Sequence, residues 1–136
     1  MRCLFCSIVN KEVLAWVIYE DERTLSFLDI HPKAPGHAMV IPKSHVASLL
    51  DLEDKDAEPL FRAMKVVQMR IMEVLRPQGF TVGVNQGRAA GQEVDHLHFH
   101  ILPRFSRDGG IAVQGLVNNP PSESLKEMAE KLSIKK

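Results

Sequence analysis

The sequence predicts an α+β domain, in which one long helix and short flanking helices accompany an antiparallel β-sheet. Short runs of alternating apolar and polar residues, bounded by turn residues, follow one another along the chain and are typical of neighbouring strands. One long segment near the middle of the chain has helical periodicity. Because most connections between the strands are short and the chain has one long helix, we expect an antiparallel sheet with the helix on one face.

The first half of the chain is expected to hold three strands. Residues 13–19, 24–28 and 37–42 have strand-like patterns, and Asp21 and Glu22 form a tight turn between the first two. The segment 29–36 contains two prolines and a glycine and is predicted to be a loop.

The long helix is predicted over 57–75, where apolar residues recur every three or four positions. Pro59 is expected in the first turn, because a proline farther inside removes a hydrogen bond, so Asp56 is the preferred N-cap. Pro77 and Gly79 are expected to end the helix.

The second half is expected to hold two long strands, over 80–84 and 94–102, on either side of a glycine-rich loop. A short amphipathic helix follows from Ser122 or Ser124 to Leu132, with a possible capping box at 124–127. We therefore divide the chain into a domain over 1–110 and a tail over 111–136.

Charge and hydropathy exclude several functions. The 17 basic and 17 acidic residues balance, so no global field attracts nucleic acid or an anionic membrane. The longest apolar stretch, 13–19, is far shorter than the roughly 20 residues that span a bilayer. The N-terminus has no basic region followed by an apolar one, so we expect a cytoplasmic protein with reduced cysteines.

Three of the six histidines, His96, His98 and His100, alternate with Leu97 and Phe99. On a strand all three imidazoles would share one face. Three side chains that titrate near neutrality indicate a metal site or histidine chemistry on a substrate. Because the row spans about 13 Å on a straight strand, the three rings cannot all bind one ion, and the spacing favours contact with an extended ligand.

The loop before the histidines, residues 84–93, has small residues and amide side chains. Its spacing matches neither a dinucleotide-binding fingerprint nor a P-loop. Backbone N–H groups near Gly91 can approach an anion closely, and Asn85 and Gln92 add side-chain donors. A flexible hairpin is the alternative, but the position beside the histidines favours ligand binding.

Cys3 and Cys6 form a C-x-x-C motif with three interpretations: zinc ligands, a redox dithiol, or two incidental thiols. The motif stands at the start of the chain with no strand before it, which argues against redox chemistry. A closed zinc site needs two more ligands.

Two long blocks resemble the histidine triad (HIT) family. Residues 91–103 resemble the family signature, in which three histidines alternate with apolar residues, and residues 27–45 resemble its nucleotide-binding first half. The resemblance covers about residues 3 to 107. It implies a HIT-like fold and an enzyme that cleaves a nucleoside 5′-monophosphate of purine type from a phosphoramidate or a dinucleoside polyphosphate.

The resemblance also implies a role for individual residues. His98 is expected to be the nucleophile, with a nucleotidyl-histidine intermediate, and His100 and His37 are expected to contact the α-phosphate. The expected substrate-binding residues are Phe27, Asp29 and Ile30 at the base and ribose, and Asn85, Gly91 and Gln92 near the phosphate. Glu93 departs from the family pattern, since other branches place Ser or Thr there.

For the C-x-x-C motif, the resemblance suggests a structural zinc ion held by Cys3, Cys6, His45 and His96. It also suggests a homodimer through the long helix and the strand near 80–84. The alternative to an enzyme is a nucleotide-binding regulatory protein with negligible turnover, but a pure binding module would not need a nucleophile at His98.

Overall fold

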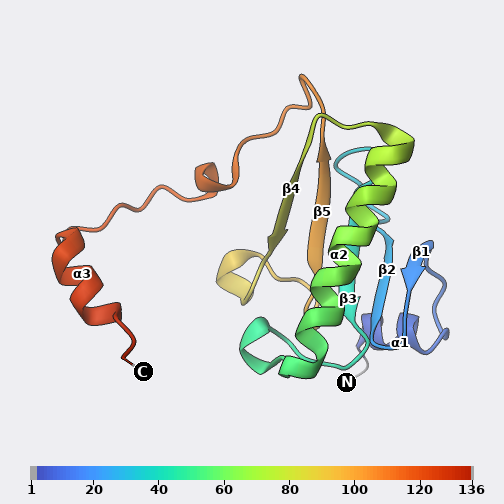
Figure 1. Cartoon of the computed structure of the whole chain (residues 1–136), viewed down its shortest axis with the longest axis horizontal. Coiled ribbons are helices and arrows are strands. Elements are labelled where there is room, and N and C mark those ends of the chain that lie inside the picture. The colour runs from blue at the N-terminus through green and yellow to red at the C-terminus, as the bar shows by residue number, and fades with distance from the viewer. Residues whose placement is uncertain (1–2, 136) are drawn as a thin grey trace.

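A computed structural model describes residues 3–135, and five antiparallel strands form one sheet in the order β1-β2-β3-β5-β4 (Figure 1). The strands are β1 (Val17–Glu20), β2 (Thr24–Leu28), β3 (Ala38–Pro42), β4 (Gly79–Val84) and β5 (Phe99–Arg104). The α-helices are α1 (Leu4–Val9), α2 (Asp54–Leu75) and α3 (Leu125–Leu132). The predicted α+β class and antiparallel sheet are confirmed.

Helix α2 lies along one face of the sheet (Figure 1). Its buried side chains Leu60, Met64 and Val67 pack against Val40 of β3 and against residues of β5 in the larger core cluster. Burial of this apolar stripe is the main stabilising term for a helix of this kind.

The predicted start of α2 is wrong. The helix begins at Asp54 after an N-cap at Glu53, so Pro59 lies inside it, and Asp56 is not its cap. The carboxylate of Asp56 instead accepts hydrogen bonds from Arg23 at 3.0 Å and Ser44 at 3.1 Å. These contacts tie the helix to two loops, and tertiary structure thus overrides the local capping signal.

A second core cluster lies on the opposite face of the sheet, where α1 packs. Phe5 and Ile8 of α1 contact a cluster that includes Leu25, Phe27 and Met39. Because both faces of β2 and β3 are covered, these strands are buried almost throughout instead of alternating.

Two predicted strands begin too early. Strand β1 begins at Val17, not residue 13, and Trp16 before it is 63% exposed. Strand β5 begins at Phe99, not residue 94, because β4 ends at Val84, which pairs with Phe99. The N–H of Leu97 donates instead to the carbonyl of Val46 at 2.7 Å.

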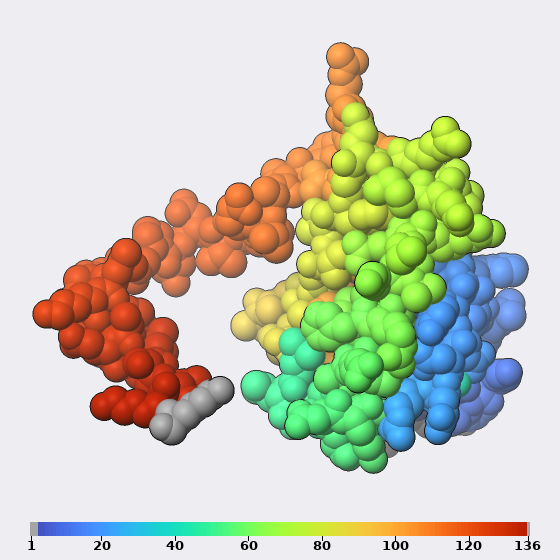
Figure 2. All heavy atoms as spheres, viewed as in Figure 1, coloured from blue at the N-terminus to red at the C-terminus, as the bar shows by residue number. Residues whose placement is uncertain are grey.

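The tail extends away from the domain (Figures 1 and 2). Its helix α3 begins at the predicted N-cap Ser124, whose Oγ accepts a hydrogen bond from the N–H of Glu127 at 3.1 Å. Among residues 3–135, no helix is both long and apolar enough to cross a membrane.

Candidate active site and metal centre

The three histidines of the row share one side of the chain although only His100 belongs to β5. The prediction that one strand carries all three is wrong, since His96 and His98 lie in the irregular segment before it. The side chains still alternate in direction along this segment, because Leu97 and Phe99 are both buried in the core beneath α2. The rings of His98 and His100 lie 5.2 Å apart between centroids.

The tautomer of His98 follows from its hydrogen bond. Its Nδ1 lies 2.7 Å from the carbonyl oxygen of His96, which can only accept, so Nδ1 carries the proton. In the neutral ring Nε2 then has a free lone pair. His98 is 7% exposed, and the Phe5 ring packs against it in a T-shaped contact, with 5.1 Å between the ring centroids. The geometry therefore presents an oriented imidazole nitrogen that can act as a nucleophile.

The tautomer of His100 is fixed by a chain of two hydrogen bonds. The N–H of Lys33 donates to Nδ1 of His37 at 3.1 Å, so the neutral His37 ring carries its proton on Nε2. That N–H lies 2.9 Å from Nδ1 of His100 and donates to it. His100 is therefore protonated on Nε2, where it can donate to a ligand.

Burial keeps both of these rings neutral. It lowers the pKa of His37, and it lowers the pKa of His100 to about 4. Asp29 lies close, with its Oδ2 at 3.5 Å from Nε2 of His37. Asp29, His37 and His100 are near enough to hold a metal ion together. However, the proton on Nε2 of His37 occupies the atom that would face the ion, and these tautomers favour an anion acceptor over a cation.

The other predicted substrate residues differ in exposure. Asn85 and His100 line the same cavity. Phe27 is buried at 2% exposure, whereas Ile30 is 73% exposed. Gly91 adopts a φ of +93° at the end of a short turn, a conformation that favours glycine.

Gln92 is engaged within the loop. Its Oε1 accepts from the N–H of Gly87 at 2.8 Å, and its Nε2 donates to the carbonyls of Ala47 and Val94. The side chain can donate to a phosphate only if one of the two bonds from Nε2 opens. Glu93, which departs from the family pattern, is exposed.

Phe5 is a neighbour of the site that sequence reasoning missed. Its ring packs edge-on against Phe27 at 5.4 Å and against His98 at 5.1 Å. The signal was present in the apolar spacing of Leu4, Phe5 and Ile8, but a six-residue helix is too short to be identified by periodicity.

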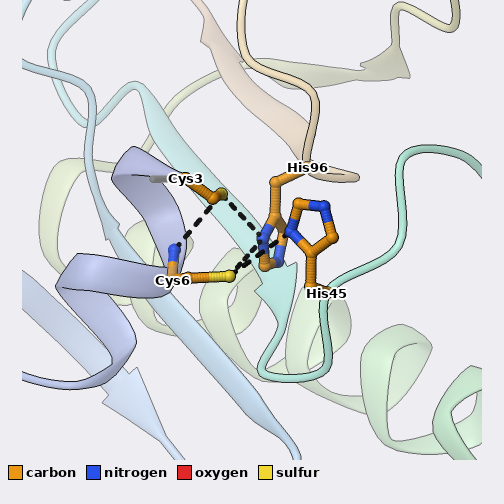
Figure 3. Close-up of side chains that lie close together, drawn as sticks. All are labelled: Cys3, Cys6, His45 and His96. Atoms are coloured by element: carbon orange, nitrogen blue, oxygen red, sulfur yellow. Dashed lines mark hydrogen bonds between the residues drawn. The ribbon is translucent and has the colours of Figure 1, made fainter. Parts of the chain in front are cut away.

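Four predicted metal ligands meet beside this row (Figure 3). Cys3 and Cys6 come from the N-terminal end of α1, His45 from the loop after β3, and His96 from the histidine row. The two cysteines are free thiols. Their ligand atoms and those of the two histidines all lie within 4.8 Å of one another, so the structure brings together residues that are 93 positions apart.

The geometry of these side chains fits a metal. Nε2 of His96 donates to the carbonyl of Pro42 at 2.8 Å, so its unprotonated Nδ1 faces the sulfurs of Cys3 and Cys6 at 3.4 and 3.6 Å. The sulfur of Cys6 also lies 3.3 Å from Nδ1 of His45. Two sulfurs and two imidazole nitrogens form a donor set typical of tetrahedral zinc. Burial, together with Cys3, raises the pKa of Cys6 to about 11 in the absence of an ion.

Comparisons with known proteins agree with this architecture. A family model described as the HIT domain matches residues 10–107. An adenosine 5′-monophosphoramidase of Schizosaccharomyces pombe is 37% identical over 99% of this chain and 98% of its own. The crystal structure of a HIT family member from Bacillus subtilis superposes with a TM-score of 0.83 at 30% identity and covers 99% of this chain and all of its own.

A zinc-bound histidine triad family protein from Mycobacterium smegmatis is 38% identical. Its structure superposes with a TM-score of 0.74 and covers 79% of this chain and 78% of its own.

Proposed function

The chain belongs to the HIT domain family. From this premise we propose that it uses His98 to hydrolyse the bond between a purine nucleoside 5′-monophosphate and a leaving group. The observation that carries the proposal is the orientation of His98, whose Nδ1–H is held by the carbonyl of His96 while Nε2 is free. The fungal relative named as a phosphoramidase supports the reaction class.

In the proposed reaction, the lone pair of His98 Nε2 attacks the α-phosphorus. A bond from phosphorus to Nε2 forms while the bond to the leaving group breaks, and the leaving group departs with the electron pair. Water then attacks the phosphorus, releases the nucleoside monophosphate and frees His98. Of the two protons of this water, one stays with the nucleoside monophosphate and the other, exchanged through solvent, replaces the proton that the leaving group takes up.

Other residues bind and orient the nucleotide in this proposal. The Nε2–H of His100, held in place by His37, donates to a non-bridging phosphate oxygen and stabilises the charge that develops there. Asn85, Gly91 and Gln92 approach the phosphate from the loop. The base and ribose lie near Phe27, Asp29 and Ile30, with Asp29 accepting from ribose hydroxyls.

We propose that Cys3, Cys6, His45 and His96 hold a structural zinc ion. The donor set and the zinc-bound relative support this assignment. A bound ion would tie α1 to the histidine row, while its chemistry stays separate from the attack by His98.

We also propose a two-fold homodimer. The outer side of α2 exposes Phe61, Met69 and Met72, at 59%, 62% and 44%. Phe80 of the edge strand β4 lines the same hollow as Met69 and Met72. Apolar surface of this kind is typical of an interface between subunits. A monomeric mass by light scattering at micromolar concentration would refute the dimer.

The test of the reaction is His98→Asn. Asparagine keeps a hydrogen-bonding side chain but lacks the nucleophilic nitrogen, so we expect turnover of an adenosine 5′-phosphoramidate to fall by several orders of magnitude while AMP binding is nearly retained. His31→Asn, at an exposed loop position, is the control and should turn over like the parent.

Quenching the parent with base during turnover of a substrate labelled at phosphorus should trap acid-labile, base-stable label on His98. Appreciable turnover by His98→Asn would mean that water attacks directly. Absence of turnover by the parent on any nucleotide substrate would favour a regulatory binding protein instead.

A further inference from the structure

The loop of residues 85–93, which precedes the histidine row, is fastened to a segment between β3 and α2. The segment is 46–49, teal in Figure 1, and it lies next to the loop, which is yellow there. Oε1 of Gln86 accepts a hydrogen bond from the N–H of Leu49 at 2.7 Å. Nε2 of Gln92 donates to the carbonyl of Ala47 at 2.9 Å. Amide side chains near both ends of the loop therefore hold it to the same short segment.

The segment 46–49 is also bonded to the histidine row. The N–H of Leu97 donates to the carbonyl of Val46 at 2.7 Å. Leu97 stands between His96 and His98, and its side chain is 0% exposed, so the core fixes its place. The segment thus joins the loop to the part of the chain that holds the proposed nucleophile.

Asn85, which is proposed to contact the phosphate, is held on both sides. Val84 before it pairs with Phe99 in the sheet, and Gln86 after it is bonded to Leu49. The side chain of Asn85 lines a cavity at the site, whereas that of Gln86 reaches the segment 46–49. Gln86 is exposed, so its bond to Leu49 adds little to the stability of the core.

The bonds inside the loop shape it but do not fix it on the domain. The N–H groups of Ala90 and Gln92 both donate to the carbonyl of Gly87, at 3.1 and 3.2 Å. Gly87 and Gly91 have φ angles of +86° and +93°. Glycine loses more backbone freedom than other residues when it is ordered, so a loop with two such positions depends on its external bonds.

We propose that Gln86 is a positioning residue for phosphate binding. Its bond to Leu49 holds Asn85 and the start of the loop in place before the nucleotide binds, and Gln86 acts through them. A loop that is ordered in advance loses less entropy when the ligand binds, and the ligand therefore binds more tightly. The inference rests on the proposed function, because it takes Asn85, Gly91 and Gln92 to be the groups that approach the phosphate.

This role predicts a difference between two ligands. The loop is proposed to contact the phosphate, whereas the base and ribose lie near Phe27, Asp29 and Ile30. Loss of the bond between Gln86 and Leu49 should therefore weaken binding of AMP and leave binding of adenosine unchanged. A role of Gln86 in the fold alone would change the affinity for both ligands or for neither.

The test measures the Kd of AMP and of adenosine by calorimetry in the parent and in Gln86→Leu. Leucine lacks the acceptor, so the Kd of AMP should rise about threefold to tenfold, the range that one hydrogen bond contributes. The Kd of adenosine should stay within about twofold of the parent value, and the Tm should be nearly unchanged because the position is exposed.

Two further variants separate the bond from other effects of the substitution. Gln86→Glu keeps an oxygen that can accept from Leu49, and it should restore most of the affinity for AMP in about 0.5 M salt, which screens the added charge. Gln78→Leu is the matched control. Gln78 is also exposed, and its Oε1 accepts from the backbone N–H of Ser106, at the end of β4 and β5 away from the loop. This variant should bind both ligands like the parent.

An unchanged Kd of AMP in Gln86→Leu, or equal losses for AMP and adenosine, would overturn the inference and leave the proposed function intact. A loss in Gln86→Glu as large as that in Gln86→Leu, or an equal loss in Gln78→Leu, would also overturn it. If the parent binds AMP no more tightly than adenosine, the proposed phosphate contacts are absent, and both the inference and the proposed function are wrong.

Discussion

His45→Ala isolates the contribution of the proposed metal ion to stability. His45 is exposed, and its ring contacts Cys6 and His96 within the ligand cluster. In metal-free protein, removal of an exposed side chain should change the free energy of unfolding by no more than about 0.5 kcal/mol. His31→Ala, at another exposed histidine, is the matched control.

The expected effect of zinc is much larger. An ion that binds the folded protein alone, at a free concentration a thousand times its Kd, stabilises it by about 4 kcal/mol. For a domain of this size that corresponds to a rise in Tm of roughly 15 °C. The variant keeps Cys3, Cys6 and His96 but has lost one of four ligands, so its Tm should rise by less than half as much.

The assay is thermal unfolding followed by circular dichroism, with a chelator and then with added zinc, together with elemental analysis of the purified protein. Hydrogen exchange adds a local measurement, because Cys3 is the N-cap of the six-residue helix α1 and Cys6 lies within it, so the helix should gain protection on binding. An identical Tm for the parent with and without zinc would refute the site. A full response in His45→Ala would show that the ion binds elsewhere.

Three further predictions concern other parts of the chain. Burial lowers the pKa of His100 to about 4, below the value near 6.5 in the unfolded chain, so the unfolded state binds more protons between these values. Stability should therefore fall by up to about 3 kcal/mol as pH drops from 6.5 to 4, and urea titrations of His100→Gln should show a smaller fall. Asp29→Ala should weaken AMP binding by about 1.5–3 kcal/mol but hardly affect the 2′,3′-dideoxy analogue, and equal losses by calorimetry would assign Asp29 to the fold alone. Gly36→Ala should destabilise by about 2–4 kcal/mol, because φ is +83° and the new Cβ would lie 2.7 Å from Leu75 Cδ1. Gly109→Ala, with φ at +76° and open space around the Cβ, should cost less in the same urea titration, and an equal cost would show that the contact is unimportant.

Local patterns in the sequence were enough to predict the fold class and most of the helices and strands. The apolar stripe of α2, the turn residues between strands and the N-cap at Ser124 each act through neighbours a few positions away, and all three are confirmed. The start of α2 was missed because Asp56 reaches Arg23 and Ser44, which are distant in sequence. Local capping rules contain no information about such partners.

The alternating histidines were likewise enough to predict a shared face, since side-chain direction follows from the order of residues along the backbone. The resemblance to a known family then supplied the four possible zinc ligands. Neither source determined which ring nitrogen carries a proton. In His98 and His100 that is decided by the His96 carbonyl and by His37.

Tertiary structure alone placed Phe5 against His98 and brought the thiols of Cys3 and Cys6 to His45 and His96. These arrangements depend on where separate segments meet in space. A hydrogen bond can select a tautomer, and side chains can form a ligand set, only after the core has fixed those segments relative to one another. The sequence thus determined which chemical groups are available, and packing decided which of them face one another.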